Sequence, residues 1–414
     1  MKIATISSGF LPVVDGVTIA VFNRIKKLSQ LGHQVLLFCP DYSGLSAIYP
    51  NWKAYTGDIL PGVRVVNLDS TSFMGVDFER NVSPKSYRTV WQELEKFQPD
   101  IIHVDEPERL WLGFLSVPGI DFSRKHNIPC VSFFHTNLIE YLEDYLPFPS
   151  QMIGIIQFLL RFHFRWTYNF YDATLTAGNS SAKKLKKVGI KNVIYGDFLG
   201  VDLETFHPEK RKNNYFEKID GLLEINSCVK LIFVGRLTRD KGWKFAIDAL
   251  QKLQKVLDFD KVALIIVGDG ELKDEIDLRL KPLTSNIHFF GRIEPPQVAE
   301  LLANSDIHIT ASEKETRGLT VLEAFASGIP VVAPDAGGVV DSIESGKNGF
   351  LFNSGDVDDF VQKLKILVDN PELRTEMGRR ARATVAGCSW DAAVQNLLKI
   401  WTDCIEKKAQ NKGS

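Results

Sequence analysis

Short apolar runs alternate along this chain with longer stretches in which apolar residues recur every three or four positions. The short runs have the length of strands and little polar character on either face, which is typical of parallel strands buried between helices. The longer stretches have the spacing of helices with one buried face. Glycine, proline and polar residues separate the two kinds of segment. This alternation predicts an α/β fold with doubly wound parallel sheets.

The predicted strands fall into two groups. The first group comprises residues 2–7, 34–39, 63–68, 99–104, 130–134, 173–177 and 193–195. The second comprises residues 230–234, 262–267, 287–290, 307–310, 331–333 and 349–352. The predicted helices are at residues 18–31, 86–97, 179–189, 243–257, 296–303, 318–326 and 357–368, with a broken helix at 113–126. The polar stretch up to Ser227 has the composition of a linker, so we expect two domains.

Composition sets limits on the function. A length of 414 residues suits two domains, and 44% hydrophobic with 24% charged residues is typical of a soluble globular protein. The net charge of −2 favours neither nucleic acid nor a membrane as a partner. Five cysteines without paired spacing, and no visible signal peptide, lead us to expect a cytoplasmic location. The apolar run 152–160 ends at Arg161 and is too short to span a membrane.

Residues 312–334 combine an expected anion site with two carboxylates. A predicted helix begins at Gly318, directly after a predicted strand, and the free N–H groups and positive dipole end of such a helix suit a phosphate. Glu315 lies just before the helix and Glu323 within it. Carboxylates beside a phosphate fit hydroxyl groups on either side of it, as in a nucleotide sugar. A surface helix with ordinary acids near its start is the competing interpretation.

A second stretch places two cations in a glycine-bounded turn. Residues 234–242 read Val-Gly-Arg-Leu-Thr-Arg-Asp-Lys-Gly and follow a predicted strand. Arg236 can contact a diphosphate through two N–H groups, and Lys241 can act on it as a point charge. Taken alone, either side chain could be a solvated surface charge.

Together the two stretches resemble the retaining nucleotide-sugar glycosyltransferases of family 4, which have the GT-B fold. The matching features are Gly-Arg-Leu-x-x-x-Lys-Gly at 235–242, the glutamates Glu315 and Glu323, and Ala-Ser-Gly-Ile-Pro-Val-Val-Ala at 326–333. The resemblance implies two Rossmann-like domains that face a cleft. It implies an acceptor-side domain at 1–205, a nucleotide-sugar domain at 206–388 and a helix at 389–414 that returns to the first domain.

The resemblance also implies roles for individual residues. Glu315, His135, Lys241 and Arg236 are the expected catalytic residues, with the two cations on the leaving diphosphate and His135 facing the donor sugar. A structural histidine remains the alternative for His135. Glu323 is expected to hold the ribose. The other expected donor-binding residues are Gly16, Gly291, Arg292, Gly318, Leu319 and Thr320. We expect no cofactor and no metal, because the cations and the helix start can stabilise the leaving group.

Local matches favour a lipid acceptor. Residues 315–324 look like a segment of bacterial diacylglycerol glycosyltransferases, and residues 106–110 and 135–141 resemble segments of digalactosyldiacylglycerol synthases. The acceptor-side candidates are Glu106, Asn137 and Tyr141. Residues 141–171 are rich in aromatic side chains with cations between them, and four lysines follow at 183–187. This composition suits a helix at an anionic membrane surface, and it suits a core helix with solvated edges equally well.

We therefore predict a retaining hexosyltransferase that moves a hexose from a nucleoside-diphosphate sugar, with UDP favoured, to a lipid or glycolipid such as a diacylglycerol glycolipid. We expect it in the cytoplasm or peripherally on the cytoplasmic membrane face, with no nucleic-acid partner. The alternatives are a family 4 transferase with a soluble sugar or polysaccharide acceptor, and a non-catalytic nucleotide-sugar-binding module. Arg317 stands where many family members carry an aromatic or apolar residue, which leaves the donor sugar open.

Overall fold

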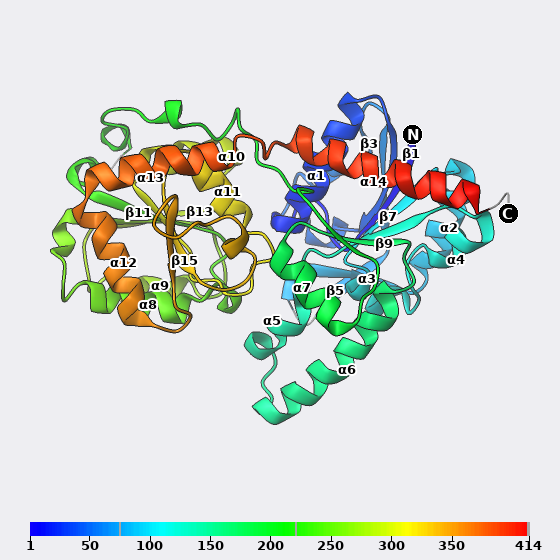
Figure 1. Ribbon diagram of the computed structural model, residues 1–414, viewed down its shortest axis with the longest axis horizontal. Coiled ribbons are helices and arrows are strands. Elements are labelled where there is room, and N and C mark those ends of the chain that lie inside the picture. Colours follow the sequence, from blue (N-terminus) through cyan, green and yellow to red (C-terminus); the bar gives the residue numbers. More distant parts are fainter. Residues whose placement is uncertain (74–75, 220–221, 412–414) are drawn as a thin grey trace. The chain divides into compact units, whose positions relative to one another are not determined.

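Mostly buried strands form two largely parallel sheets in this protein (Figure 1). The computed structural model describes residues 1–73, 76–219 and 222–411, with the backbone alone at 76–79. The chain divides into two compact units. Unit 1 comprises Met1–Ile139, Pro149–Gly200 and Trp390–Ser414, and unit 2 comprises Glu140–Phe148 and Val201–Ser389.

Within the described residues, unit 1 contains an eight-stranded sheet in the order β10-β9-β8-β7-β1-β2-β4-β3. Its neighbouring strands are parallel except for β3 and β4, and β5 and β6 form a separate antiparallel pair. The strands are β1 (Lys2–Ser7), β2 (Gln34–Pro40), β3 (Gly57–Leu60), β4 (Val63–Leu68), β5 (Ser70–Phe73), β6 (Val76–Val82), β7 (Ile101–Asp105), β8 (Cys130–Phe133), β9 (Ala173–Thr176) and β10 (Val193–Tyr195). Because β8, β7 and β1 are adjacent and parallel, the loops that follow them share one edge of the sheet.

The helices of unit 1 are α1 (Gly16–Gln30), α2 (Ser86–Phe97), α3 (Pro107–Phe114), α4 (Ile120–His126), α6 (Ser150–Tyr168), α7 (Asn179–Val188) and α14 (Trp390–Gln410). Helix α5 (Leu138–Tyr145) begins in unit 1 and ends in unit 2. Helix α14 packs on α1, where Asp391 lies 2.9 Å from Lys27, and it buries Trp401. No helix of the described ranges is both long enough and apolar enough to cross a bilayer.

Unit 2 has a parallel sheet of six strands within the described residues, in the order β13-β12-β11-β14-β15-β16. The strands are β11 (Val229–Val234), β12 (Val262–Val267), β13 (Ile287–Gly291), β14 (Ile307–Ile309), β15 (Val331–Pro334) and β16 (Gly349–Phe352). The helices are α8 (Trp243–Leu253), α9 (Lys273–Leu280), α10 (Pro295–Asn304), α11 (Leu319–Ala326), α12 (Val357–Asp369) and α13 (Pro371–Thr384). Since β11 and β14 are neighbours, the turns that carry the two predicted motifs begin side by side.

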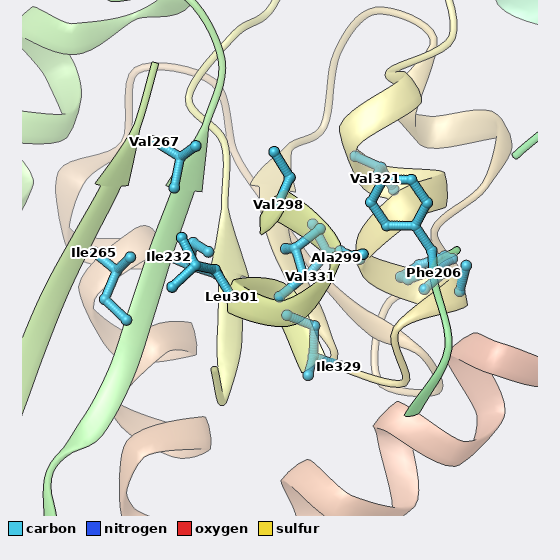
Figure 2. Close-up of a cluster of buried hydrophobic side chains, with 14 of the residues drawn as sticks. Phe206, Ile232, Ile265, Val267, Val298, Ala299, Leu301, Val321, Ile329 and Val331 are labelled. Carbon is cyan, nitrogen blue, oxygen red and sulfur yellow. The ribbon is translucent and has the colours of Figure 1, made fainter. Parts of the chain in front are cut away.

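A buried apolar cluster covers one face of this sheet (Figure 2). Ile232 and Ile265 from the strands meet Val298 and Val321 from the helices there, and all four side chains are buried. The alternate strand residues, such as Leu231, belong to a second core cluster. Burial on both faces explains why these strands have no polar face in the sequence.

The predicted α/β class with two Rossmann-like sheets is confirmed. The predicted linker before Ser227 is wrong, because Phe216, Leu222 and Ile225 pack into the core of unit 2. Strands β3, β5 and β6 and helices α3, α5, α9 and α13 are present in addition to the predicted elements. The domain limits expected from the resemblance stay predictions.

Candidate active site

The turn after β11 carries two of the predicted residues, Arg236 and Lys241. Gly235 and Gly242 bound it with φ values of 151° and 72°, which residues with a side chain rarely adopt. A Cβ atom on Gly242 would also lie 2.2 Å from the carbonyl oxygen of Ala311, which follows the neighbouring strand β14. The glycines therefore hold the turn directly against the end of the next strand.

Asp240 is buried in this turn and orients its cations. Its carboxylate accepts hydrogen bonds from the Thr238 hydroxyl at 2.6 Å and from the Tyr145 hydroxyl at 2.5 Å, and Arg236 lies 3.4 Å away. Burial raises the pKa of Asp240, but Lys241 and Arg236 outweigh burial and hold that pKa below its usual value. The sequence analysis missed Asp240. The one signal available was its position between two cations, Arg239 and Lys241, in an expected anion site.

Lys241 and Glu315 form an ion pair, with 2.6 Å between Nζ and Oε1. Burial lowers the pKa of Lys241, but the Glu315 carboxylate raises it by more. Burial likewise raises the pKa of Glu315, and Lys241 lowers it by more. Both side chains are therefore charged, so the structure brings a predicted cation and a predicted carboxylate together across 74 positions of sequence.

Two glycines of a later turn hold the loop that carries Glu315. The Gly338 N–H donates to the Glu315 carbonyl oxygen at 2.6 Å. A Cβ atom on Gly337 would lie 2.7 Å from the Glu313 carbonyl oxygen, and one on Gly338 would lie 2.0 Å from that of Thr316. Direct backbone contact therefore sets the position of Glu315, and it leaves no room for side chains at these glycines.

We expect Gly338→Ala to lower turnover by about tenfold or more, because the added methyl group must push the Thr316 backbone away and move Glu315. Gly338 has φ of −86°, so the effect would come from contact and not from backbone strain. Steady-state kinetics measures the loss in kcat. Gly387→Ala, which adds a methyl group to open space, is the matched control and should keep wild-type turnover. Wild-type turnover in Gly338→Ala would show that catalysis does not depend on this backbone contact.

Helix α11 begins at Leu319, with Gly318 as its N-terminal cap at φ 72°. Within the described residues, no hydrogen bond uses the backbone N–H groups of Leu319 and Thr320. These groups and the positive end of the helix dipole suit an anion, as the sequence analysis expects. Glu323 is partly buried one turn further on, and burial raises its pKa to about 8. No described side chain donates to this carboxylate, which therefore retains its capacity to accept hydroxyl groups.

The turns after β12 and β13 pack beside the turn after β11. A Cβ atom on Gly268 would lie 1.9 Å from the Gly235 carbonyl oxygen, and the Gly268 N–H donates to the Gly291 carbonyl oxygen at 2.8 Å. Gly291 has φ of 62°, and Arg292 follows it. The predicted donor residues Gly291 and Arg292 therefore belong to the same edge of the sheet as Arg236.

In unit 1, His135 belongs to a buried polar cluster. Its Nε2 lies 2.7 Å from Asp105 Oδ1, and because a carboxylate only accepts, Nε2 carries the proton. The His135 ring stacks on Phe133 with 4.1 Å between centroids. Asp105 and Phe133 therefore fix both the tautomer and the plane of the ring.

Arg24 neutralises Asp105 inside this cluster. Its Nη1 lies 3.1 Å from Asp105 Oδ1 and 2.9 Å from His103 Nε2, and its Nη2 binds the other carboxylate oxygen. Burial raises the pKa of Asp105, but Arg24 outweighs burial and the pKa lies well below its usual range. Burial and Arg24 lower the pKa of His103 to about 4, so this histidine is neutral. The sequence analysis missed Arg24 and Asp105.

The remaining predicted residues occupy varied environments. Glu106 is buried, and its carboxylate accepts a hydrogen bond from the Ser8 hydroxyl. Asn137 is half-buried in unit 1, whereas the half-buried Tyr141 belongs to unit 2. Gly16 is the exposed first residue of α1. The structure therefore does not gather the three acceptor-side candidates in one unit.

Two family models match most of the chain. Residues 14–204 match the family described as Glycosyltransferase Family 4. Residues 215–384 match the family described as Glycosyl transferases group 1. The second match contains the Arg236 turn, Glu315 and α11.

Known proteins similar to this chain extend over nearly all of it. The sulfoquinovosyl transferase SQD2 of Arabidopsis thaliana is 31% identical over 386 residues, which cover 91% of this chain and 68% of that protein. The alpha-monoglucosyldiacylglycerol synthase of Acholeplasma laidlawii is 23% identical over 422 residues, with 98% of each chain covered. The solved sucrose-phosphate synthase of Thermosynechococcus elongatus has a TM-score of 0.79 at 17% identity and covers 98% of this chain and 99% of that one, which shows a shared fold.

Proposed function

Because the chain belongs to glycosyltransferase family 4 (glycosyl transferases group 1) and is a retaining, nucleotide-sugar-dependent glycosyltransferase with the GT-B fold, we propose that it transfers a hexose from a UDP-sugar to a diacylglycerol-based lipid or glycolipid. Use of a nucleotide-sugar donor is supported by the Lys241–Glu315 ion pair, which lies at the same edge of the sheet as the start of α11. The proposed lipid acceptor is supported by the similarity to the Acholeplasma laidlawii enzyme, whose name includes diacylglycerol.

The cations act on the leaving group. As the bond between sugar and phosphate breaks, the nucleoside diphosphate gains negative charge. Lys241, Arg236 and the free N–H groups at the start of α11 stabilise that charge. Groups fixed before the reaction stabilise a transition state without reorganisation, and each can contribute several kcal/mol. Asp240 keeps both cations in the turn while the donor is absent.

The carboxylates act on hydroxyl groups. Glu315 exchanges part of its contact with Lys241 for hydroxyl groups of the donor sugar, and Glu323 accepts the ribose hydroxyls. His135 positions the donor sugar, with its ring held by Asp105. The acceptor hydroxyl attacks on the face from which the phosphate departs, and its proton passes to the departing phosphate oxygen. The configuration is therefore retained without a covalent enzyme intermediate. No residue in this scheme requires a metal or a further cofactor.

We expect Glu323→Gln to weaken nucleoside-diphosphate binding by about tenfold or more in alkaline buffer, where the wild-type carboxylate is ionised. The pKa of Glu323 is about 8 without ligand, so the acceptor form is present above that pH and lost below it. Wild-type affinity for UDP should therefore rise as pH rises towards 8, and the glutamine variant should lack that component. Calorimetric titration with UDP measures both effects.

The exposed Glu344 provides a matched control for this titration. Glu344→Gln removes the same charge from unit 2 and should bind UDP as the wild type does. Equal UDP affinity and equal pH dependence in Glu323→Gln and the wild type would remove Glu323 from the ribose site.

A transfer assay tests the proposed function as a whole. Purified protein is incubated with radiolabelled UDP- and GDP-sugars, with or without vesicles that contain diacylglycerol and its glycolipids. Label in the organic phase with one donor supports the proposal and identifies the sugar. Label only in a water-soluble product would replace the lipid acceptor by a soluble one, and tight UDP-sugar binding with no product would indicate a binding module.

A further inference from the structure

Helix α6 is apolar on two opposite faces, and unit 1 covers only one of them. The inner face contributes Ile153, Phe164, Thr167 and Tyr168, which are buried. Phe164 and Tyr168 pack in a core cluster with Leu185 of α7. Figure 1 shows α6 projecting away from the sheet of unit 1. The inner face accounts for the packing of α6, so the opposite face needs another explanation.

The opposite face carries a continuous stripe of large apolar side chains. We call it the outer stripe, and its members are Met152, Ile155, Phe158, Leu159, Phe162 and Trp166. Each is between 47% and 62% exposed, and most are spaced by three or four residues, as one helix face requires. Single exposed apolar residues are common on protein surfaces, but a continuous patch of this kind marks a surface that meets another apolar phase.

The charge around the outer stripe is strongly positive. Between residues 147 and 196 the sequence has seven lysines and arginines and one acid, Asp172, in a chain whose net charge is −2. Asp172 is already paired with Lys408 at 2.8 Å. Helices α6 and α7 themselves contain no acidic residue. An anionic surface therefore matches this region, whereas a second copy of the same region would be repelled.

Direct contacts keep the lysines of α7 beside the outer stripe. The Asn169 side chain donates to the Gly189 carbonyl oxygen at 3.1 Å, and a Cβ atom on Gly189 would lie 3.1 Å from the Arg165 side chain. Gly189 caps α7, whose last turn carries Lys186 and Lys187. Arg165 and Asn169 also line a surface groove of about 360 Å³ together with Phe162, Trp166 and Phe170. Aromatic rings and a guanidinium group thus meet at the end of the outer stripe.

We propose that the outer stripe and the α7 lysines form a docking surface for an anionic lipid bilayer. The outer stripe inserts at the boundary between headgroups and acyl chains, as amphipathic interfacial helices do. Arg161 and Arg165 extend towards the headgroups, and the α7 lysines attract anionic lipid. Lys183, Lys184, Lys186 and Lys187 are all exposed. Docking of this kind would bring unit 1 to the membrane without a spanning helix.

Flotation with vesicles of equal parts phosphatidylcholine and phosphatidylglycerol tests the proposal. The wild type is expected to float with these vesicles and to remain unbound with phosphatidylcholine alone. The variant Ile155→Ser/Leu159→Ser/Phe162→Ser should lose binding by about tenfold or more. Replacement of any one α7 lysine by glutamine should weaken vesicle binding by about fivefold, and added salt should weaken that binding further. Leu278→Ser, at an exposed leucine of α9, should bind as the wild type does.

The assay omits the sugar donor, so it is independent of the proposed reaction. Circular dichroism and thermal unfolding of the serine variant, compared with the wild type, test whether unit 1, which carries the substitutions, has folded. A wild type that fails to float with the anionic vesicles overturns the docking surface and leaves the transferase proposal standing. Dimerisation of the wild type that the serine substitutions abolish, without vesicle binding, would assign the outer stripe to a second copy and would also overturn it.

Discussion

Lys241→Ala is expected to lower kcat by about a hundredfold, which corresponds to about 2.7 kcal/mol of activation free energy. Lys241 is held at 2.6 Å from Glu315 and at 3.7 Å from Asp240, so its charge is fixed before the donor binds. Alanine removes the cation that offsets the growing charge on the diphosphate, and it leaves Glu315 beside that charge without its partner. The loss should therefore appear mainly in kcat, because it acts on the transition state.

Lys244→Ala provides the matched control, since Lys244 is an exposed lysine three residues further along in α8. Steady-state kinetics with the assigned donor and acceptor should give wild-type turnover for this variant. Circular dichroism should show that both variants are folded. Wild-type turnover in Lys241→Ala would remove Lys241 from the diphosphate site and with it the main electrostatic argument for the mechanism.

Arg24→Met is expected to destabilise unit 1 by about 3–5 kcal/mol, because it leaves the buried Asp105 carboxylate without its neutralising partner. Methionine keeps a long apolar side chain at this position, so the effect comes mainly from charge and not from a cavity. Thermal and urea unfolding measure the loss. Lys26→Met, at an exposed position of the same helix, should change stability by well under 1 kcal/mol.

The pH dependence of the Arg24 variant identifies the cause. In the wild type, Arg24 holds the pKa of Asp105 far below its usual value, so the ion pair stabilises the fold at all pH values above the unfolded pKa of Asp. Without Arg24, burial raises the pKa of Asp105, and His103 no longer has a cation beside it. The folded cluster should then take up a proton in mildly acidic buffer. This uptake should reduce the difference in unfolding free energy between the variant and the wild type. A difference in unfolding free energy that stays constant across this pH range would indicate lost packing and not the unpaired charge.

Burial explains which strands could be predicted from the sequence. All six residues of β12 are buried and apolar, and the predicted range matches Val262–Val267. Strands β3 and β5 contain mainly polar or half-exposed residues and pair in antiparallel fashion, so they lack the apolar run that identifies a buried strand. Helix α9 buries only Ile276 and Leu280, which is too few positions for a clear helical period.

The chemistry of the candidate site could be predicted where a local motif carried it. The glycine-bounded turn with Arg236 and Lys241 is one such motif, and Glu315 with α11 is another. Arg24 and Asp105 had no such signal, because their importance comes from contacts between distant segments. Arg24 and Asp105, for example, are 81 positions apart. The arginine on the apolar face of α1 was the available clue.

Helix α6 shows where periodicity fails. Its sequence supported a core helix and an interfacial helix equally, because apolar residues occupy two faces. In the structure the inner face is buried in unit 1, as a core helix requires, and the outer stripe is exposed, so the interfacial interpretation stays a prediction for that face. Periodicity can indicate that both faces are apolar, but only the three-dimensional structure shows which face is covered.

The most direct test of the proposed function is the initial rate of nucleoside-diphosphate release, measured with saturating donor and with acceptor lipid present in or absent from vesicles. The proposed function predicts that release is slow without lipid, rises with the amount of acceptor, and yields an equal amount of glycolipid with the donor's anomeric configuration. Release that is equally fast without lipid, or that requires only a water-soluble sugar, would contradict a lipid-directed transferase.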